Sequence, residues 1–331
     1  MHFLRTLSTL VLGLSSLVSA ATYTNPIKAK DGSDPHIVYT AGYYYLMASL
    51  PEANTTTWTS LQITRATTIN GLKSGETKVV YTQSSGSRSG NIWAPELHYL
   101  DNAWYIYFTA GDGKDLGTQR PHVLKGGASP WDSFSFLSTL SSAWGIDGTI
   151  LRFSSWGNYF VYSCFLNGSP QSLCISKLNS PGSIGSPKLL SQPTLSWETV
   201  RNPVNEGPAA MYHGGKTYLT YSASDCWTTS YSLGLLTWNG SGDPSLAASW
   251  SKSGPLLTSA NGNYGTGHNG FFQSPDGTEI WNVYHATANS AGACDGNRYT
   301  MVNKVNWNSN GTPNLGTPAK LGTSFTGPSG E

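Results

Sequence analysis

A short pattern of polar and apolar positions recurs five times along the chain. In each occurrence a polar residue opens a short apolar run, a turn follows, and a second strand begins at an aromatic residue. That second strand carries a Tyr or Met three residues later and a small residue two positions further on. Strand, turn and alternation signals dominate and no helical period is sustained, so the pattern predicts an all-β protein.

The repeated unit is long enough to hold four short strands. The residues that open the five units are Asp34, Glu96, Asp147, Glu206 and His268, at intervals of 51 to 62 residues. A unit of this size cannot bury both faces of its sheet alone, whereas radial packing around an axis buries them against neighbouring units. The sequence therefore predicts a five-bladed β-propeller over residues 21–331 as a single catalytic domain. A two-sheet sandwich, the main alternative, would not give so long a period.

The five opening residues are predicted to ring one end of the propeller axis, because equivalent positions of the blades converge there. Any one of them alone would be explained as a turn or cap residue. Four carboxylates and an imidazole, in a chain with 18 acidic residues, favour a site instead. No short loop of clustered oxygen ligands resembles an EF-hand. Carboxylates on opposite sides of a cavity suit glycoside hydrolysis, which needs an acid and a base on opposite faces of a sugar ring.

Composition and the N-terminus narrow the setting. The chain has 331 residues, a net charge of +1 and 11% charged residues, and no basic block or acidic tail indicates a nucleic-acid or charged partner. Arg5 and the apolar residues 7–18, followed by small residues before Ala21, are typical of a signal peptide over residues 1–20. No later segment is long and apolar enough to span a bilayer. We expect a secreted, extracellular monomer with no membrane partner.

The cysteines and sequons agree with export. Cys164 and Cys174 flank a predicted turn symmetrically, which favours a disulfide across a hairpin and leaves Cys226 to pair with Cys294. No cysteine spacing resembles a zinc site. Four N-x-[ST] sequons are candidate glycosylation sites; they begin at Asn54, Asn167, Asn239 and Asn310.

Five ordered motifs resemble the blade signatures of glycoside hydrolase family 43. They are GSDPHI, NIWAPELHY, WGIDGTI, NEGPAA and GTGHNGFF, and the resemblance runs from about residue 23 to residue 298. That family consists of inverting enzymes on five-bladed propellers that act on arabinans, arabinoxylans and xylans. The resemblance implies that Asp34 is the general base, Glu206 the general acid, and Asp147 the acid that orients Glu206 and modulates its pKa.

Four further residues are candidates for substrate binding. Trp93 would form a stacking wall for the sugar or be an ordinary buried tryptophan, and Glu96 stands where many family members have Asp. His268 resembles a histidine near the axis that contacts an ion in many members, so calcium or sodium could lie beside it, although no cofactor is expected to be required. Arg298 resembles an arginine that reaches the pocket, and a buried arginine should face an acid or the substrate.

The resemblance favours an exo-acting α-L-arabinofuranosidase that degrades α-1,5-arabinan or arabino-oligosaccharides, with plant cell-wall arabinan or arabinoxylan as its partner. Endo-1,5-α-L-arabinanase and β-xylosidase are the alternatives. The chain ends soon after the fifth unit, without room for the added β-sandwich that many β-xylosidases of the family carry, so β-xylosidase is the less favoured of the two. A non-catalytic sugar-binding propeller is the alternative from another class, and it would not need an acid and a base across the ring.

Overall fold

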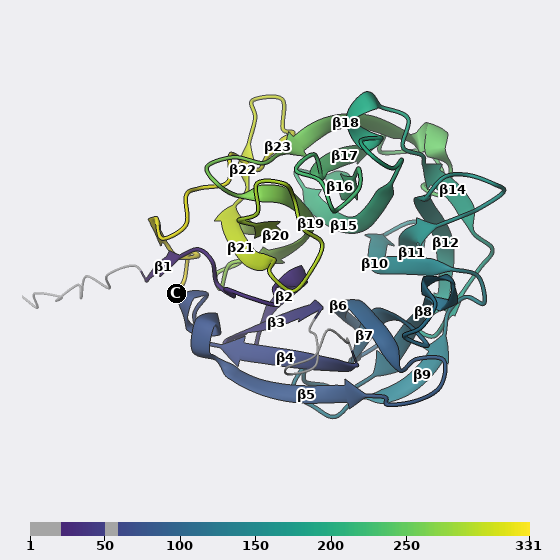
Figure 1. Cartoon of the computed structure of the whole chain (residues 1–331), viewed down its shortest axis with the longest axis horizontal. Helices are drawn as coiled ribbons and strands as arrows, with labels where there is room; N and C mark the ends of the chain where they lie inside the picture. Colours follow the sequence, from purple (N-terminus) through teal and green to yellow (C-terminus); the bar gives the residue numbers. More distant parts are fainter. Residues whose placement is uncertain (1–20, 50–58) are drawn as a thin grey trace, which may run out of the picture.

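Five sheets lie around a common axis, each with one strand innermost (Figure 1). The computed structural model describes residues 21–49 and 59–331. The predicted signal peptide and the sequon at Asn54 lie outside the described residues. The five-bladed β-propeller predicted from the repeat is confirmed. No helix within residues 21–49 and 59–331 is long and apolar enough to cross a membrane.

The strands of each blade are antiparallel and follow one another in chain order from the axis outwards. Blade 1 contains β2 (Ser33–Thr40), β3 (Tyr43–Ser49), β4 (Ser60–Ala66) and β5 (Glu76–Thr82). Blade 2 contains β6 (Gly90–Leu100), β7 (Ala103–Gly111), β8 (Arg120–Lys125) and β9 (Ser135–Thr139). Blade 3 contains β10 (Gly145–Phe153), β11 (Gly157–Cys164) and β12 (Ser172–Ser180), with β13 (Ser183–Ile184) and β14 (Lys188–Ser191) both paired to β12.

The second half of the chain continues the pattern. Blade 4 contains β15 (Asn205–His213), β16 (Lys216–Ala223), β17 (Ser232–Trp238) and β18 (Trp250–Leu257). Blade 5 contains β19 (Tyr264–Gln273), β20 (Ile280–Thr287) and β21 (Tyr299–Lys304). Short additions are the strands β22 (Asn306–Trp307) and β23 (Pro313–Asn314), and the 3₁₀ turns η1 (Asn70–Ser74), η2 (Leu116–Thr118), η3 (Ser196–Glu198) and η4 (Ala247–Ser249).

The two ends of the described chain pair with each other beside blade 5. β1 (Thr22–Thr24) pairs with β24 (Ser324–Thr326). The residues after β1 then bond to β21: the Ile27 N–H donates to the Thr300 carbonyl, and the Asn25 side chain exchanges hydrogen bonds with the Val302 backbone. The start of the chain thus covers the outer edge of the three-stranded fifth sheet, an edge that would otherwise expose unpaired backbone groups.

Apolar clusters fill the spaces between neighbouring blades. Tyr107 of β7 packs against Phe160 of β11 with ring centroids 5.7 Å apart, and Tyr44 of β3 packs against Phe272 of β19 at 5.8 Å. All nine residues of β7 are buried, because both faces of a blade contact other blades. This packing holds the five innermost strands, β2, β6, β10, β15 and β19, against one another around the axis.

Candidate active site

Each innermost strand contains a β-bulge near its start, where its pairing with the next strand is interrupted. At the equivalent place in each of the five strands, one bulge residue has a positive φ angle: Asp34 (52°), Ala94 (48°), Asp147 (59°), Gly207 (53°) and His268 (42°). Non-glycine residues adopt this conformation at a cost, and bulges re-aim side chains near functional sites. These five residues form a ring around the axis. Their bulges point the side chains in directions that the regular alternation of a strand would not give.

A side chain from the preceding blade holds four of the five bulges. The backbone N–H of each bulge residue donates to a group on the second strand of that blade: Ala94 to Ser49 Oγ (2.7 Å), Asp147 to Thr109 Oγ1 (3.2 Å), His268 to Ser222 Oγ (2.7 Å) and Asp34 to His285 Nδ1 (3.1 Å). These bonds satisfy N–H groups that the bulge removes from the strand ladder. Each bulge is thereby fixed relative to the neighbouring blade.

The ring corrects one alignment made from the sequence. The repeat places Glu96 at the same position as Asp34, but the bulge residue of blade 2 is Ala94. Glu96 lies two residues beyond Ala94 on β6, where it pairs with Tyr107 of β7. It therefore corresponds to His36, which lies two residues beyond Asp34 on β2. Polarity alone selected Glu96, because an alanine at the bulge leaves no polar signal. Three of the predicted residues do occupy the ring, and Glu206 directly precedes the ring residue of blade 4; the three are Asp34, Asp147 and His268.

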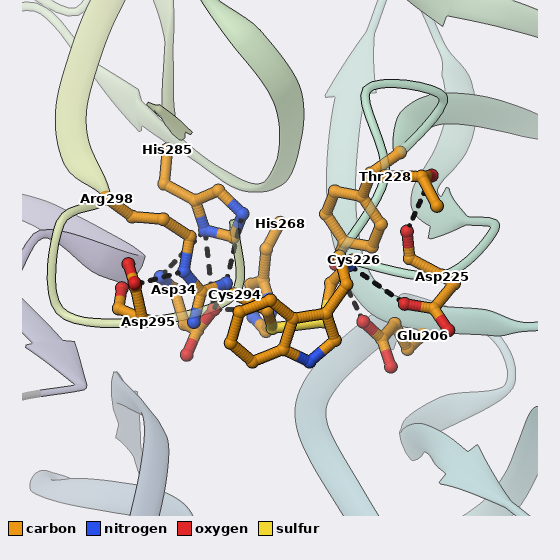
Figure 2. The surroundings of a disulfide bond; sticks show 12 residues. Asp34, Glu206, Asp225, Cys226, Thr228, His268, His285, Cys294, Asp295 and Arg298 are labelled. Carbon is orange, nitrogen blue, oxygen red and sulfur yellow. Dashed lines mark hydrogen bonds and ion pairs between the residues drawn. A yellow bond between two sulfur atoms is a disulfide. The ribbon is translucent and has the colours of Figure 1, made fainter. Parts of the chain in front are cut away.

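The carboxylate of Asp34 lies beside the Arg298 guanidinium and the imidazole rings of His268 and His285 (Figure 2). Ser49 Oγ donates to Oδ2 at 2.6 Å, and Arg298 Nη1, His268 Nδ1 and His285 Nδ1 lie 3.3–3.4 Å from Oδ1. Burial by itself raises the pKa of Asp34, but the charge of Arg298, followed by the two histidines, outweighs it and holds the pKa well below its usual range. Asp34 is therefore an ionised carboxylate.

Glu206 has the opposite character. The Tyr231 hydroxyl donates to Oε1 and the Gln171 amide to Oε2, each at 2.8 Å. Burial, together with the negative charge of Asp34, raises the pKa of Glu206 to about 7 although both hydrogen bonds oppose the shift. A carboxyl with this pKa still carries its proton in mildly acidic solution.

Asp147 is coupled to Glu206. Its Oδ2 accepts the Gly207 N–H at 3.1 Å, and His268 Nδ1 lies 3.7 Å from the same atom. Burial, followed by the negative charges of Glu206 and Asp34, raises the pKa of Asp147 well above its usual range. Two buried carboxyls that repel each other's charge release their protons in two steps that belong to the pair. The site thus combines one ionised carboxylate with a pair that retains a proton.

Two further predicted residues lie at the same end of the axis. Arg298 is buried and its guanidinium faces Asp34 and His285, which confirms that it pairs with an acid. Trp93 directly precedes the bulge residue Ala94 and is half-buried. A sugar contact by Trp93 or Arg298 stays a prediction.

Three residues that contact the carboxylates were not predicted from the sequence, because they come from strands and loops that carry no repeat-opening residue: His285, Tyr231 and Gln171. One signal existed for His285. It occupies the position on β20 that Ser49, Thr109 and Ser222 occupy in other blades, where the polar group anchors the next bulge. Tyr231 and Gln171 carried no such signal.

Both predicted disulfides are confirmed. Cys164 bonds to Cys174 between β11 and β12, and Cys226 bonds to Cys294 beside the carboxylates (Figure 2). The three sequon asparagines within the described residues are exposed, and their glycosylation stays a prediction; they are Asn167, Asn239 and Asn310.

The other end of the axis holds a cavity of about 520 Å³ with His36, Glu96, His98 and Arg152 among its lining residues. These two histidines and Glu96 lie close enough to share an ion. However, the Leu97 N–H donates to His36 Nδ1 at 3.3 Å, so the neutral ring carries its proton on Nε2 and that nitrogen has no lone pair to offer. His98 Nε2 lies 2.7 Å from Glu96, as expected for a hydrogen-bonded carboxylate.

Within residues 21–49 and 59–331, His268 belongs to no cluster of three or more His, Cys, Asp or Glu side chains that lie close enough to share an ion. Its Nδ1 faces Asp34 and Asp147. An ion beside His268 therefore stays a prediction. Glu96 lines the axial cavity rather than standing in the ring, although its charge still acts on His268. Its contact with substrate stays a prediction.

Comparisons with known proteins agree with this arrangement. An extracellular exo-α-(1→5)-L-arabinofuranosidase of Streptomyces avermitilis is 40% identical over 92% of this chain and 65% of its own length. The α-L-arabinofuranosidase 43 of Humicola insolens is 37% identical over the same shares. This chain thus spans just under two thirds of those relatives. The crystal structure of an α-L-arabinofuranosidase from Lactobacillus brevis superposes with a TM-score of 0.83 at 30% identity, covering 91% of this chain and 98% of that one.

These likenesses cover nearly the whole described chain, including the ring of bulges and the carboxyl groups beside it. The sequence profile of glycosyl hydrolases family 43 matches residues 23–313, which include all five blades. This chain belongs to glycosyl hydrolases family 43.

Proposed function

We propose that the chain is a secreted, inverting glycoside hydrolase that releases arabinose from the ends of α-1,5-linked arabinan and arabino-oligosaccharides. The observation that carries the proposal is the contrast between two partly buried carboxyls at one end of the axis. The pKa of Asp34 is held well below its usual range, whereas that of Glu206 is raised to about 7. In mildly acidic solution one is a base and the other an acid, as this hydrolysis requires.

The reaction follows from these two states. Glu206 donates its proton to the glycosidic oxygen as the bond from that oxygen to the anomeric carbon breaks. Asp34 removes a proton from a water molecule whose oxygen bonds to the anomeric carbon from the opposite side. Asp147 keeps a proton within its pair with Glu206, and Arg298 keeps Asp34 ionised. After one turnover Glu206 is ionised and Asp34 protonated, and exchange with solvent restores both.

The substrate class rests on the relatives. The four curated relatives, 32–40% identical, are all named arabinofuranosidases, and two of the names specify exo action on α-(1→5) linkages. Two similar structures, named as an endo-1,4-β-xylanase and a xylan β-1,4-xylosidase, are 20% and 18% identical and support the fold alone. Secretion is proposed from the N-terminal sequence and from the extracellular relative.

The test is product analysis on four substrates. Purified protein is incubated with debranched arabinan, arabino-oligosaccharides, arabinoxylan and linear xylan, and the products are followed chromatographically from the first minutes. Arabinose as the first product from arabinan supports the proposal. Early oligosaccharides would indicate endo-arabinanase, xylose from xylan would indicate β-xylosidase, and sugar binding without release would indicate a non-catalytic propeller. The Glu206→Ala variant is the background control.

A further inference from the structure

Two loops beside the carboxylates each end in a residue that contacts one of them. The loop between β16 and β17 ends at Tyr231, whose hydroxyl donates to Glu206. The loop between β20 and β21 ends at Arg298, whose guanidinium lies against Asp34. The position of the first loop thus affects the proposed acid, and the position of the second affects the proposed base.

Hydrogen bonds within each loop connect its cysteine to that contacting residue. In the first loop the Asp225 carbonyl accepts the N–H and the hydroxyl of Thr228, and the Thr228 carbonyl in turn accepts the Tyr231 N–H. In the second loop the Asp295 carbonyl accepts both the N–H and Nε of Arg298. Cys226 and Cys294 are the direct sequence neighbours of Asp225 and Asp295, so each cysteine is tied to a short, hydrogen-bonded turn (Figure 2).

The two loops meet at the Cys226–Cys294 disulfide. The bond joins residues 68 positions apart with Cα atoms separated by 5.4 Å. Close to it, a Cβ added to Gly292 would lie 2.6–2.9 Å from the backbone of Thr228, so the loops are in direct contact and only glycine fits. Movement of one loop relative to the other is therefore limited by a covalent bond and by a tight steric fit.

We propose that the Cys226–Cys294 disulfide is a positioning bond that holds the partners of the acid and of the base in a fixed relation. This inference rests on the proposed function for its catalytic consequence. With the bond intact, Tyr231 and Arg298 keep fixed positions relative to each other. Glu206 and Asp34 therefore keep the separation that one substrate and one water molecule require. Misplacement of a reacting group by about 1 Å can cost a factor of roughly 100 in rate.

The same bond makes activity sensitive to thiols. Cys226 and Cys294 are half-buried, whereas the exposed fractions of Cys164 and Cys174 are 3% and 0%. A thiolate must reach a sulfur atom to exchange with it, so a dithiol reductant attacks the Cys226–Cys294 bond first. Dithiothreitol then becomes a cyclic disulfide and the protein gains two thiols. Oxidised glutathione reverses the change and is itself reduced to two molecules of glutathione.

Two double variants, each with one disulfide, provide the test. Cys164→Ser/Cys174→Ser retains the bond between the loops; it should keep the kcat of the unmodified protein and lose it reversibly in dithiothreitol. Cys226→Ser/Cys294→Ser should have a kcat lower by roughly 10-fold or more, with KM changed by less than about 3-fold, and no response to dithiothreitol. Hydrogen exchange followed by mass spectrometry should become faster in residues 224–231 and 288–298 of the second variant only. Melting temperatures are measured for both.

The outcomes separate the inference from the proposed function. An unchanged kcat in Cys226→Ser/Cys294→Ser, or equal losses of kcat and melting temperature in the two double variants, would overturn the positioning role. If the unmodified protein releases no sugar from any substrate, the proposed function fails, and hydrogen exchange still decides about the bond. In that case unchanged exchange in both loops overturns the inference, and faster exchange confined to them supports the ordering that it requires.

Discussion

The Nη1 atom of Arg298 lies 3.4 Å from Oδ1 of Asp34, although 264 positions separate the two residues in the sequence. They meet because blade 5, the last blade, packs beside blade 1. The contact places a permanent positive charge beside the proposed base. The pKa of Asp34 in the first blade therefore depends on a residue that precedes the last strand of blade 5.

Loss of this positive charge should move the whole pH profile. In Arg298→Met the pKa values of both Asp34 and Glu206 should rise, because the guanidinium lowers both. Since the base must be ionised and the acid protonated, both limbs of the kcat/KM profile should shift to higher pH. Arg65→Met is the control, because Arg65 pairs with Glu76 between the outer strands β4 and β5. An acidic limb that does not move would argue against the role of Arg298.

The acid and the base should differ in how they depend on the leaving group. Asp34→Ala and Glu206→Ala should each lower kcat on arabino-oligosaccharides by at least ~100-fold while the fold survives. An aryl arabinofuranoside with an acidic phenol needs little protonation of its leaving oxygen. Glu206→Ala should therefore recover much of its activity on this substrate, and Asp34→Ala should not. Equal losses on both substrates would contradict the assignment, with circular dichroism as the check on folding.

Asp147→Asn should move the alkaline limb to lower pH. The negative charges of Asp147 and Glu206 repel each other, so removal of one carboxylate lowers the pKa of the other. Glu206 then loses its proton at a lower pH and activity falls earlier as pH rises. An asparagine retains an oxygen that can accept the Gly207 N–H, which preserves the local hydrogen bond. The measurement is kcat/KM from pH 4 to 9, and an alkaline limb unchanged or shifted upwards would refute the coupling.

Tyr231→Phe should have the opposite effect. The Tyr231 hydroxyl donates to Glu206 and thereby favours its ionised form, so loss of the hydroxyl raises the pKa of Glu206 above about 7. The alkaline limb should then extend to higher pH. Tyr218→Phe serves as the matched control, because the Tyr218 hydroxyl donates to the Gly311 carbonyl instead. The same shift in both variants would point to a general effect on stability.

The first sugar product should have inverted configuration. Inversion needs room for a water molecule, with the two carboxyls roughly 6.5–9.5 Å apart, against about 5–5.5 Å for retention. Asp34 and Glu206 belong to blades 1 and 4, blade 5 lies between those blades, and Figure 2 shows the two side chains on opposite sides of the group. Proton NMR in the opening minutes should show β-arabinofuranose from an α-linked substrate. An α product formed first would require a covalent intermediate and exclude Asp34 as the base.

The sequence alone was sufficient for the features that depend on local order. The long period and the apolar second strands predicted five blades, because a strand buried on both faces must be apolar along its length, as β7 is. The Cys164–Cys174 bond followed from the symmetry of one hairpin. Asp34 and Asp147 were found because each opens an apolar run at the same point of a repeated pattern.

Only the tertiary structure revealed which residues surround the carboxylates and where each bulge lies. Glu96 was placed in the ring because the sequence shows polarity, whereas the ring is defined by backbone geometry at Ala94. His285 and Arg298 reach Asp34 across the junction of blades 5 and 1, and Tyr231 reaches Glu206 from the end of a loop. Such contacts depend on how separate sheets pack side by side, and the hydrophobic effect that drives this packing is non-directional. Their positions are set by the sum of all the interfaces around the axis, so no short stretch of sequence contains them.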